Sequence, residues 1–175
     1  DLKPLINALS KYKIEIVSSG GTYKKIKRLG FKCVEISKFT NTPEILNGRV
    51  KTLHPKIYGG ILNKRQDKIH CREIRKNNYE NIDLIIANFY PFEDTLLKKS
   101  DHNKIIENID IGGPTIVRAA AKNYNDVVVI SNPNQYQRFI NELKTNKGST
   151  SLSFREKLAD CLLYTSPSPR DIMRS

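Results

Sequence analysis

The chain has 175 residues, of which 38% are hydrophobic and 27% charged, and its formal net charge at pH 7 is +12. These values are typical of a single globular domain with enough chain to bury a core, and they exclude a disordered polypeptide. No apolar run approaches the ~20 residues of a transmembrane helix, and the first residues do not form a secretory signal, so a cytoplasmic location is expected. The 3 cysteines and 3 histidines are dispersed, which argues against a disulfide framework or a zinc site.

The positive charge alone would suit a nucleic-acid-binding protein. The basic residues are mostly lysines spread along the chain, however, and no helix-turn-helix, zinc-finger or RNA-recognition signature accompanies them. Many of them are expected only to solvate helix faces. A local excess remains between Ser19 and Arg65, where Glu35 and Glu44 are the acidic residues. That excess fits a substrate that carries a phosphate.

Hydrophobic periodicity predicts alternating helices and strands. Leu2, Leu5, Ile6 and Leu9 have the spacing of one helical face. Further helices are expected at residues 23–29, 66–77, 114–122 and 133–144, with one or two helical turns within 96–108 and the beginning of a helix at 154–159. Short apolar runs predict strands at residues 14–17, 31–36, 83–89 and 127–130. This alternation indicates an α/β fold with a parallel sheet covered on both faces, and residues 40–60 are expected to be its least regular part.

A cluster of cations stands out within residues 48–62, GRVKTLHPKIYGGIL, where Arg49, Lys51, His54 and Lys56 occur without any acidic residue. A surface strand does not need such a concentration, and a core strand could not bury these groups unpaired. We therefore expect an anionic or strongly polar partner for this stretch.

Two further loops carry residues suited to a ligand. The sequence SSGGT at residues 18–22 lies between a predicted strand and a predicted helix, where glycines let backbone N–H groups approach a phosphate and Thr22 can cap the helix. Close packing of the strand and the helix would explain the glycines equally well. Asn88 interrupts the apolar strand predicted at residues 83–89, and Tyr90 marks its end, at the edge where α/β sheets bind ligands. A buried, satisfied asparagine and a rim tyrosine are the alternative.

A fourth loop, IDIGGPTIVRAAAKN at residues 109–123, places Asp110 before two glycines and a predicted helix. Arg118 and Lys122 follow on that helix four residues apart, a spacing at which like charges repel slightly. If this face of the helix is exposed to solvent, the repulsion is tolerated. On an inward face the pair needs an anion or a carboxylate such as Asp110, and Lys122 could then donate and accept protons.

Taken together and in this order, SGGT, GRVKTLHPKIYGGIL, NFYPF, ENIDIGGPTIVRAAAKN and SFREKLA closely resemble the N-terminal IMP cyclohydrolase domain of the bifunctional purine biosynthesis proteins, AICAR transformylase/IMP cyclohydrolase. The resemblance implies a methylglyoxal-synthase-like three-layer α/β fold with a mostly parallel central sheet. The implied reaction, of the cyclic-amidine hydrolase class, closes FAICAR to inosine monophosphate (IMP) with loss of water. It is the last step of IMP synthesis, and no metal or organic cofactor is expected for it.

The resemblance also implies roles for individual residues. The implied proton carrier is Lys122, and Asp110, Tyr90 and Lys51 are the implied catalytic helpers. The implied substrate contacts are Ser19, Gly20, Gly21, Thr22, Arg49, Val50, Thr52, Asn88, Phe89 and Ile111. The implied partner is a purine ribotide rather than a nucleic acid or a membrane, and the intact protein is expected to be a homodimer.

The chain departs from the family pattern at both ends. Family members begin with a strand and a nucleotide-contacting loop that would precede Asp1, and they continue into a formyltransferase domain beyond about Asp160. We therefore expect a cyclohydrolase domain over residues 1–160 that lacks one wall of the phosphate site, and we do not expect the chain as written to be a competent enzyme. Residues 161–175, which include YTSPSPRDIMRS, are expected to be a foreign or disordered tail outside the fold.

Other functions occur on this fold. A nucleotide-binding regulatory module, as in carbamoyl phosphate synthetase, is the main alternative, and methylglyoxal synthase is another. The GRVKTLHP and AAAKN stretches argue against both. A nucleic-acid-binding protein is the third alternative.

Overall fold

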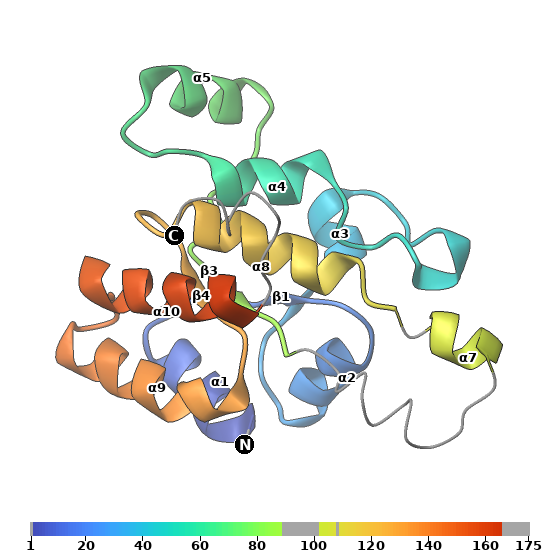
Figure 1. Cartoon of the computed structure of the whole chain (residues 1–175), viewed down its shortest axis with the longest axis horizontal. Coiled ribbons are helices and arrows are strands. Elements are labelled where there is room, and N and C mark those ends of the chain that lie inside the picture. Colours follow the sequence, from blue (N-terminus) through green and yellow to red (C-terminus); the bar gives the residue numbers. More distant parts are fainter. Residues whose placement is uncertain (1, 89–101, 108, 166–175) are drawn as a thin grey trace.

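The computed structural model describes residues 2–88, 102–107 and 109–165 (Figure 1). The helices are α1 (Leu2–Lys11), α2 (Gly20–Arg28), α3 (Ile36–Thr40), α4 (Pro55–Leu62), α5 (Lys68–Lys76), α7 (His102–Glu107), α8 (Gly112–Lys122), α9 (Tyr136–Thr145) and α10 (Leu152–Thr165), with short 3-10 turns η1 (Leu46–Gly48) and η2 (Pro133–Gln135). The strands are β1 (Val17–Ser18), β2 (Val34–Glu35), β3 (Leu84–Ile86) and β4 (Val128–Ile130). Within this part of the chain, no helix combines the length and apolarity needed to cross a membrane.

The strands form two parallel pairs, as the alternation of strands and helices predicts. In the first pair Val17 lies opposite Val34, and in the second Leu84 lies opposite Val128. Each strand is shorter than the apolar run that predicted it, because only residues that hydrogen-bond to a partner strand are part of the sheet. The loops that follow β1 and β3 therefore leave the carboxyl ends of parallel strands, which is where α/β proteins place ligands.

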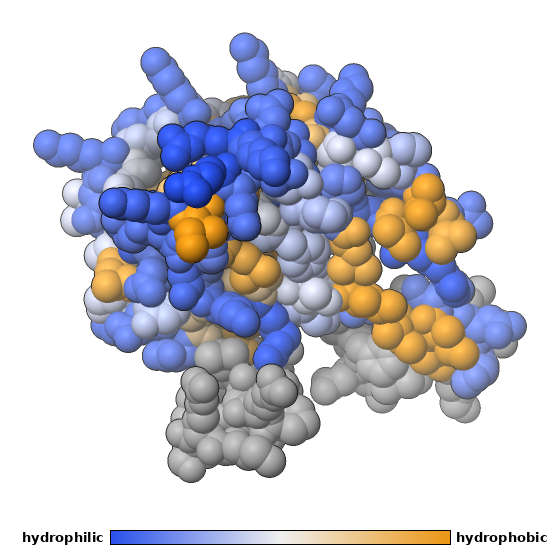
Figure 2. All heavy atoms as spheres, turned by 90° about the horizontal axis from the view of Figure 1, so that it is seen from above, coloured by the Kyte–Doolittle hydropathy of each residue, from blue (hydrophilic) through white to orange (hydrophobic). Residues whose placement is uncertain are grey.

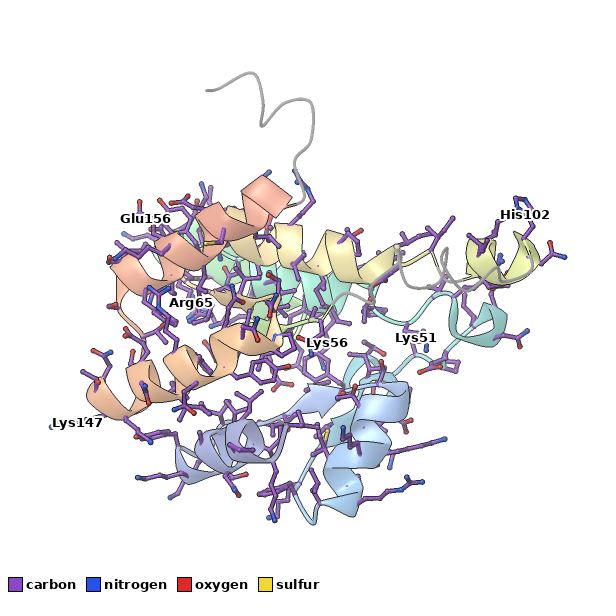
Figure 3. All side chains as sticks on the ribbon, turned by 60° about the horizontal axis from the view of Figure 1, so that its bottom comes forward. Lys51, Lys56, Arg65, His102, Lys147 and Glu156 are labelled. Carbon is purple, nitrogen blue, oxygen red and sulfur yellow. The ribbon has the colours of Figure 1, made fainter. Side chains whose placement is uncertain are left out.

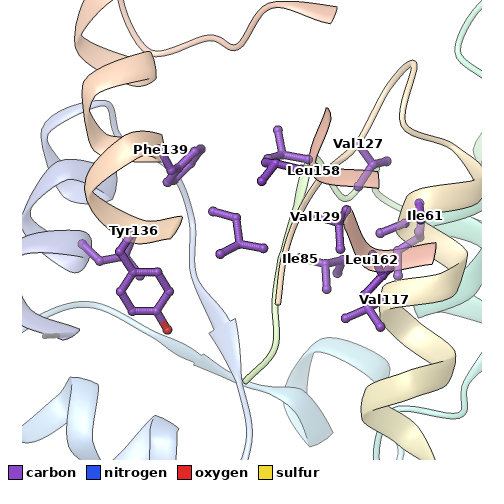
Figure 4. Packing of buried hydrophobic residues seen from close by; sticks show 14 of the residues in the cluster. Ile61, Ile85, Val117, Val127, Val129, Tyr136, Phe139, Leu158 and Leu162 are labelled. Carbon is purple, nitrogen blue, oxygen red and sulfur yellow. The ribbon is translucent and has the colours of Figure 1, made fainter. Parts of the chain in front are cut away.

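The hydrophobic core lies on both sides of β3 and β4 (Figure 4). On one side α9 supplies Tyr136 and Phe139, and on the other α8 supplies Val117, which is fully buried. Val129 and Ile85 lie between these layers. Helix α10 packs against α8 and β4. The predicted α/β architecture with a covered sheet is thereby confirmed.

The sequence-based prediction that residues 40–60 are irregular is wrong for their last part. Helix α4 begins at Pro55, directly after His54, whose imidazole accepts the backbone N–H of Lys56. Proline suits the first position of a helix because its missing N–H would have no partner there. The buried Ile57 and Ile61 then turn one face of α4 into the core.

The prediction that the fold ends at residue 160 is also wrong. Helix α10 continues to Thr165, and Leu162 is only 1% exposed within the core. An apolar side chain buried to this extent contributes to the packing of the domain. Residues 166–175 lie outside the described part of the chain.

Candidate active site

The segment from Arg49 to Thr52 lies between the N-termini of two helices. A methyl group built on Gly20, at the start of α2, would lie 3.9 Å from Lys51 Nζ. A methyl group built on Gly112, at the start of α8, would lie 2.8 Å from Thr52 Oγ1. Helix N-termini carry unpaired N–H groups and a partial positive charge, so they favour anions. Three of the four loops singled out in the sequence therefore meet at one place.

The first turn of α2 forms one side of this place. Helix α2 begins at Gly20, so the expectation that Thr22 caps it is wrong, because Thr22 already lies inside the helix. Ser19 is the N-cap residue, and its side chain makes no capping hydrogen bond. The first backbone N–H groups of a helix have no intrahelical partner. Those of α2 are consequently suited to an incoming acceptor such as a phosphate.

A tight turn at η1 positions Lys51 at the site. Leu46, Asn47 and Gly48 all have positive φ angles, of 53°, 53° and 84°. The turn brings Val50 back to pair antiparallel with Ile45. A methyl group on Gly48 would lie 2.6 Å from Cε of Lys51, so the lysine stem folds over a position that only glycine can occupy without displacement.

Both exposed cations of this segment meet carboxylates from other parts of the chain. Lys51 Nζ lies 3.9 Å from Glu44, and Arg49 forms an ion pair with Glu107 of α7. The ion pair raises the pKa of the Arg49 guanidinium and lowers the pKa of the Glu107 carboxyl. Both pairs are solvent-accessible and thus weak. An anionic ligand can therefore displace either carboxylate, a competition that the sequence alone did not reveal.

The other two cations of the cluster bind protein groups. The Lys56 side chain is only 15% exposed, and its Nζ donates a hydrogen bond to the Phe39 carbonyl at 2.7 Å. His54 contacts Thr42. Figure 3 shows Lys56 inside the molecule and Lys51 near α2. Lys56 Nζ also lies 3.7 Å from the Glu80 carboxylate, so the expected anionic or polar partners of these two residues are groups of the protein itself.

Asp110 caps helix α8. Its Oδ1 accepts the backbone N–H of Gly113 at 2.8 Å. Ile111 already has helical φ and ψ angles, so the helix effectively starts there and Asp110 occupies the N-cap position. Ile111 itself is 62% exposed.

Lys122 lies at the opposite end of α8 from Asp110. The helix has 11 residues, and at a rise of ~1.5 Å per residue its two ends are roughly 15 Å apart. A lysine side chain cannot span that distance. The hypothesis that Asp110 orients Lys122 is therefore wrong. Asn123, the next residue, is buried and donates to the carbonyls of Ile61 and Asn63, which fixes this end of the helix.

Strand β3 ends at Ile86, before the predicted end at residue 89, so Asn88 follows the strand instead of interrupting it. The Asn88 side chain already has a hydrogen-bond partner within the protein. Its Nδ2 donates a hydrogen bond to the Tyr136 hydroxyl at 2.7 Å. Asn88 thus ties the end of β3 to α9, a structural contact that leaves its amide oxygen for other partners. The predicted site residues Phe89 and Tyr90 lie outside the described residues.

Exposed apolar side chains gather beside the site. Figure 2 shows them on one side of the face in view. Leu46 on η1 is 67% exposed, and Ile106 on α7 is 44% exposed. Ile45, Ile109 and Ile111 are exposed as well. The turn at η1 accordingly presents both a cationic and an apolar surface.

Comparison with known proteins places the chain in a family. The model of the MGS-like domain matches residues 1–115. The chain belongs to the MGS-like domain family. A second model, of the AICARFT/IMPCHase bienzyme, matches residues 120–166, and that match also runs past the predicted end of the fold. The predicted methylglyoxal-synthase-like fold class and the family resemblance are thereby confirmed.

Individual relatives of this MGS-like domain agree with the family match. The chain is 52% identical over 147 residues to the bifunctional purine biosynthesis protein PurH of Acetivibrio thermocellus, which covers 83% of the chain. It is 49% identical over 151 residues to PurH of Prochlorococcus marinus (strain MIT 9312), which covers 86%. The chain spans 28% and 29% of the lengths of these two relatives. The crystal structure of ForH superposes with a TM-score of 0.82 and 29% sequence identity, covering 94% of this chain and 85% of that one.

Proposed function

We propose that this MGS-like domain carries IMP cyclohydrolase activity, the dehydrative ring closure of FAICAR to IMP. One structural observation carries the proposal: Lys51 lies beside the N-terminus of α2, and Thr52 lies beside the N-terminus of α8. Both helix N-termini favour an anion such as the phosphate of a ribotide. The relatives that match most of the chain are named as purine biosynthesis proteins, which supports the same substrate class.

In the proposed reaction the carboxamide nitrogen of FAICAR attacks its formamide carbon. A new carbon–nitrogen bond closes the ring, and the carbon–oxygen bond of the formyl group breaks. The carboxamide nitrogen and the formamide N–H each give up one proton, and the two protons leave with the formyl oxygen as water. Holding the two groups in contact removes an entropic barrier of up to ~7–11 kcal/mol. The first turn of α2 would bind the phosphate and so supply this positioning, and Arg49 stays a sequence-based prediction for a further contact.

Lys51 is the proposed donor to the formyl oxygen as negative charge develops there. Removal of one such donor typically slows a reaction by ~10²–10³. Tyr90 is proposed as a second donor and Asp110 as a further helper. Lys122 stays a sequence-based prediction for the proton carrier, without the contact to Asp110 that was expected for it.

The test measures IMP binding to the 175-residue chain by titration calorimetry, and FAICAR cyclisation by the full-length protein, which includes this domain, by spectroscopy. We expect IMP to bind and inosine, which lacks the phosphate, to bind at least tenfold more weakly, because charge-assisted hydrogen bonds are lost. Lys51→Ala should weaken IMP binding more than tenfold, whereas Lys76→Ala on α5 should not. Equal binding of IMP and inosine would contradict the proposed phosphate site.

The same measurements separate the alternatives. Binding of IMP by the full-length protein without cyclisation of FAICAR would favour a nucleotide-binding regulatory module. Formation of methylglyoxal from dihydroxyacetone phosphate would favour a methylglyoxal synthase. Thermal protection by duplex DNA but not by IMP would favour a nucleic-acid-binding protein.

We also propose that the full-length protein is a homodimer and that it is cytoplasmic. The exposed apolar residues around η1 and α7 support the first of these, because patches of this kind commonly mark protein interfaces. Sedimentation velocity of the full-length protein should give the mass of a dimer. A monomer at all concentrations would contradict that proposal.

A further inference from the structure

The segment that carries Arg49, Lys51 and Thr52 is a closed loop. His54 Nε2 lies 3.2 Å from Thr42 Oγ1, so a side-chain contact joins two residues that are 12 positions apart in sequence. Everything between them, including η1 and the cationic residues, belongs to this loop. A loop whose ends are joined has fewer conformations to lose when it binds a ligand.

The hydrogen bonds around His54 define which ring nitrogen carries the proton. Its Nδ1 accepts the backbone N–H of Lys56 at 3.1 Å, which caps α4. Because Nδ1 is an acceptor, the proton of the neutral ring is on Nε2, which donates to Thr42 Oγ1. The Thr42 hydroxyl can in turn donate to the Thr40 carbonyl, 3.4 Å away at the end of α3. One imidazole thus links the start of α4 to the end of α3.

A second contact joins the same two helices. Lys56 Nζ donates to the carbonyl of Phe39 at 2.7 Å and lies 4.4 Å from the centroid of the Phe39 ring. His54 and Lys56, which the candidate site does not use, therefore both hold the base of the loop. Both residues directly follow the loop, which is why they can close its base.

We propose that His54 and Thr42 are positioning residues, which close the base of the loop and so hold Lys51 and Thr52 against α2 and α8. The inference rests on the proposed function only in taking Lys51 and Thr52 as ligand-binding residues. Neither His54 nor Thr42 needs to touch the ligand. Breaking their contact should let the loop sample other conformations and should weaken binding without unfolding the domain.

The experiment compares variants that separate the two bonds of His54. His54→Asn keeps an oxygen that can cap α4 but is too short to reach Thr42. Thr42→Val removes the hydroxyl and leaves the cap intact, and Thr42→Ser keeps the hydroxyl. Thr145→Val on α9 controls for the loss of a threonine hydroxyl elsewhere.

We expect His54→Asn and Thr42→Val each to weaken IMP binding by roughly three- to tenfold, the range that loss of one net hydrogen bond produces. Combining them should add little, because both remove the same contact. Thr42→Ser and Thr145→Val should bind as wild type. In cyclisation assays the effect should fall on KM more than on kcat.

Three outcomes would overturn a claim. If wild-type protein does not bind IMP, the proposed function fails. If wild type binds and Thr42→Val binds equally well, the positioning role fails and the proposed function stands. A melting temperature that falls in His54→Asn and Thr42→Val while IMP affinity is unchanged would assign the contact to stability alone, which also overturns the inference.

Discussion

Replacement of Asp110 separates its structural role from its proposed chemical one. The Asp110 carboxylate accepts the Gly113 N–H at 2.8 Å and caps α8. Replacing such a cap by alanine typically costs ~1 kcal/mol. With a urea dependence of ~1–3 kcal/mol per molar, that loss lowers the unfolding midpoint by roughly 0.3–1 M. Asparagine is as good a cap as aspartate, so the midpoint of Asp110→Asn should stay closer to wild type.

A matched control, Asp67→Ala, separates the loss of a helix cap from the loss of a residue of the candidate site. Asp67 caps α5 in the same way, by accepting the N–H of Ile69 at 2.8 Å, but lies away from the candidate site. Asp67→Ala should lower the midpoint and leave IMP affinity unchanged. If Asp110 assists the reaction, Asp110→Asn should slow cyclisation at least tenfold despite near-normal stability. An Asp110→Ala midpoint equal to wild type would refute the capping argument, and full activity in Asp110→Asn would refute the chemical one.

Three other predictions concern stability, pH dependence and the far end of α8. Gly60→Ala should lower the free energy of unfolding by roughly 1–3 kcal/mol, because the new methyl would overlap the Glu80 carbonyl oxygen, and thermal unfolding measures this. Hydrogen bonds from Ser151 lower the pKa of Glu142 below its ordinary value of 4.5, so their stabilisation is complete above that pH and is lost as the pH falls through the lowered pKa. Urea unfolding between pH 3 and 7 should therefore show a weaker pH dependence for Glu142→Gln than for wild type, and identical curves would contradict this. Lys122→Ala should leave IMP affinity within about twofold of wild type, because Lys122 lies roughly 15 Å from the start of α8, and an unchanged kcat would refute its predicted role as proton carrier.

Local patterns in the sequence predicted most helices and the approximate positions of the four strands. The spacing of Leu5, Ile6 and Leu9 placed α1 correctly, because an apolar face with helical periodicity must be buried. Helix α8 followed from its glycines, proline and alanines. The same reasoning failed at α4, where proline and paired glycines suggested irregular structure, although proline starts that helix and Gly60 packs closely against residues 80–82.

The cations of residues 48–62 show why a site cannot be read from composition. The sequence treats Arg49, Lys51, His54 and Lys56 as equivalent, because nothing local distinguishes a lysine that binds a ligand from one that binds a carbonyl. The carboxylate of Glu107, which pairs with Arg49, lies 58 positions away in the chain. Only the folded chain brings such groups together.

The sequence by itself determined that the chain is an α/β protein with four unusual loops, since periodicity and turn residues act over a few neighbouring positions. The tertiary structure decided which of these loops meet. It set Lys51 and Thr52 between two helix N-termini, turned His54 and Lys56 toward α3, and separated Asp110 from Lys122 by the length of a helix. Contacts of this kind depend on the packing of distant segments against one core, and no local pattern records them.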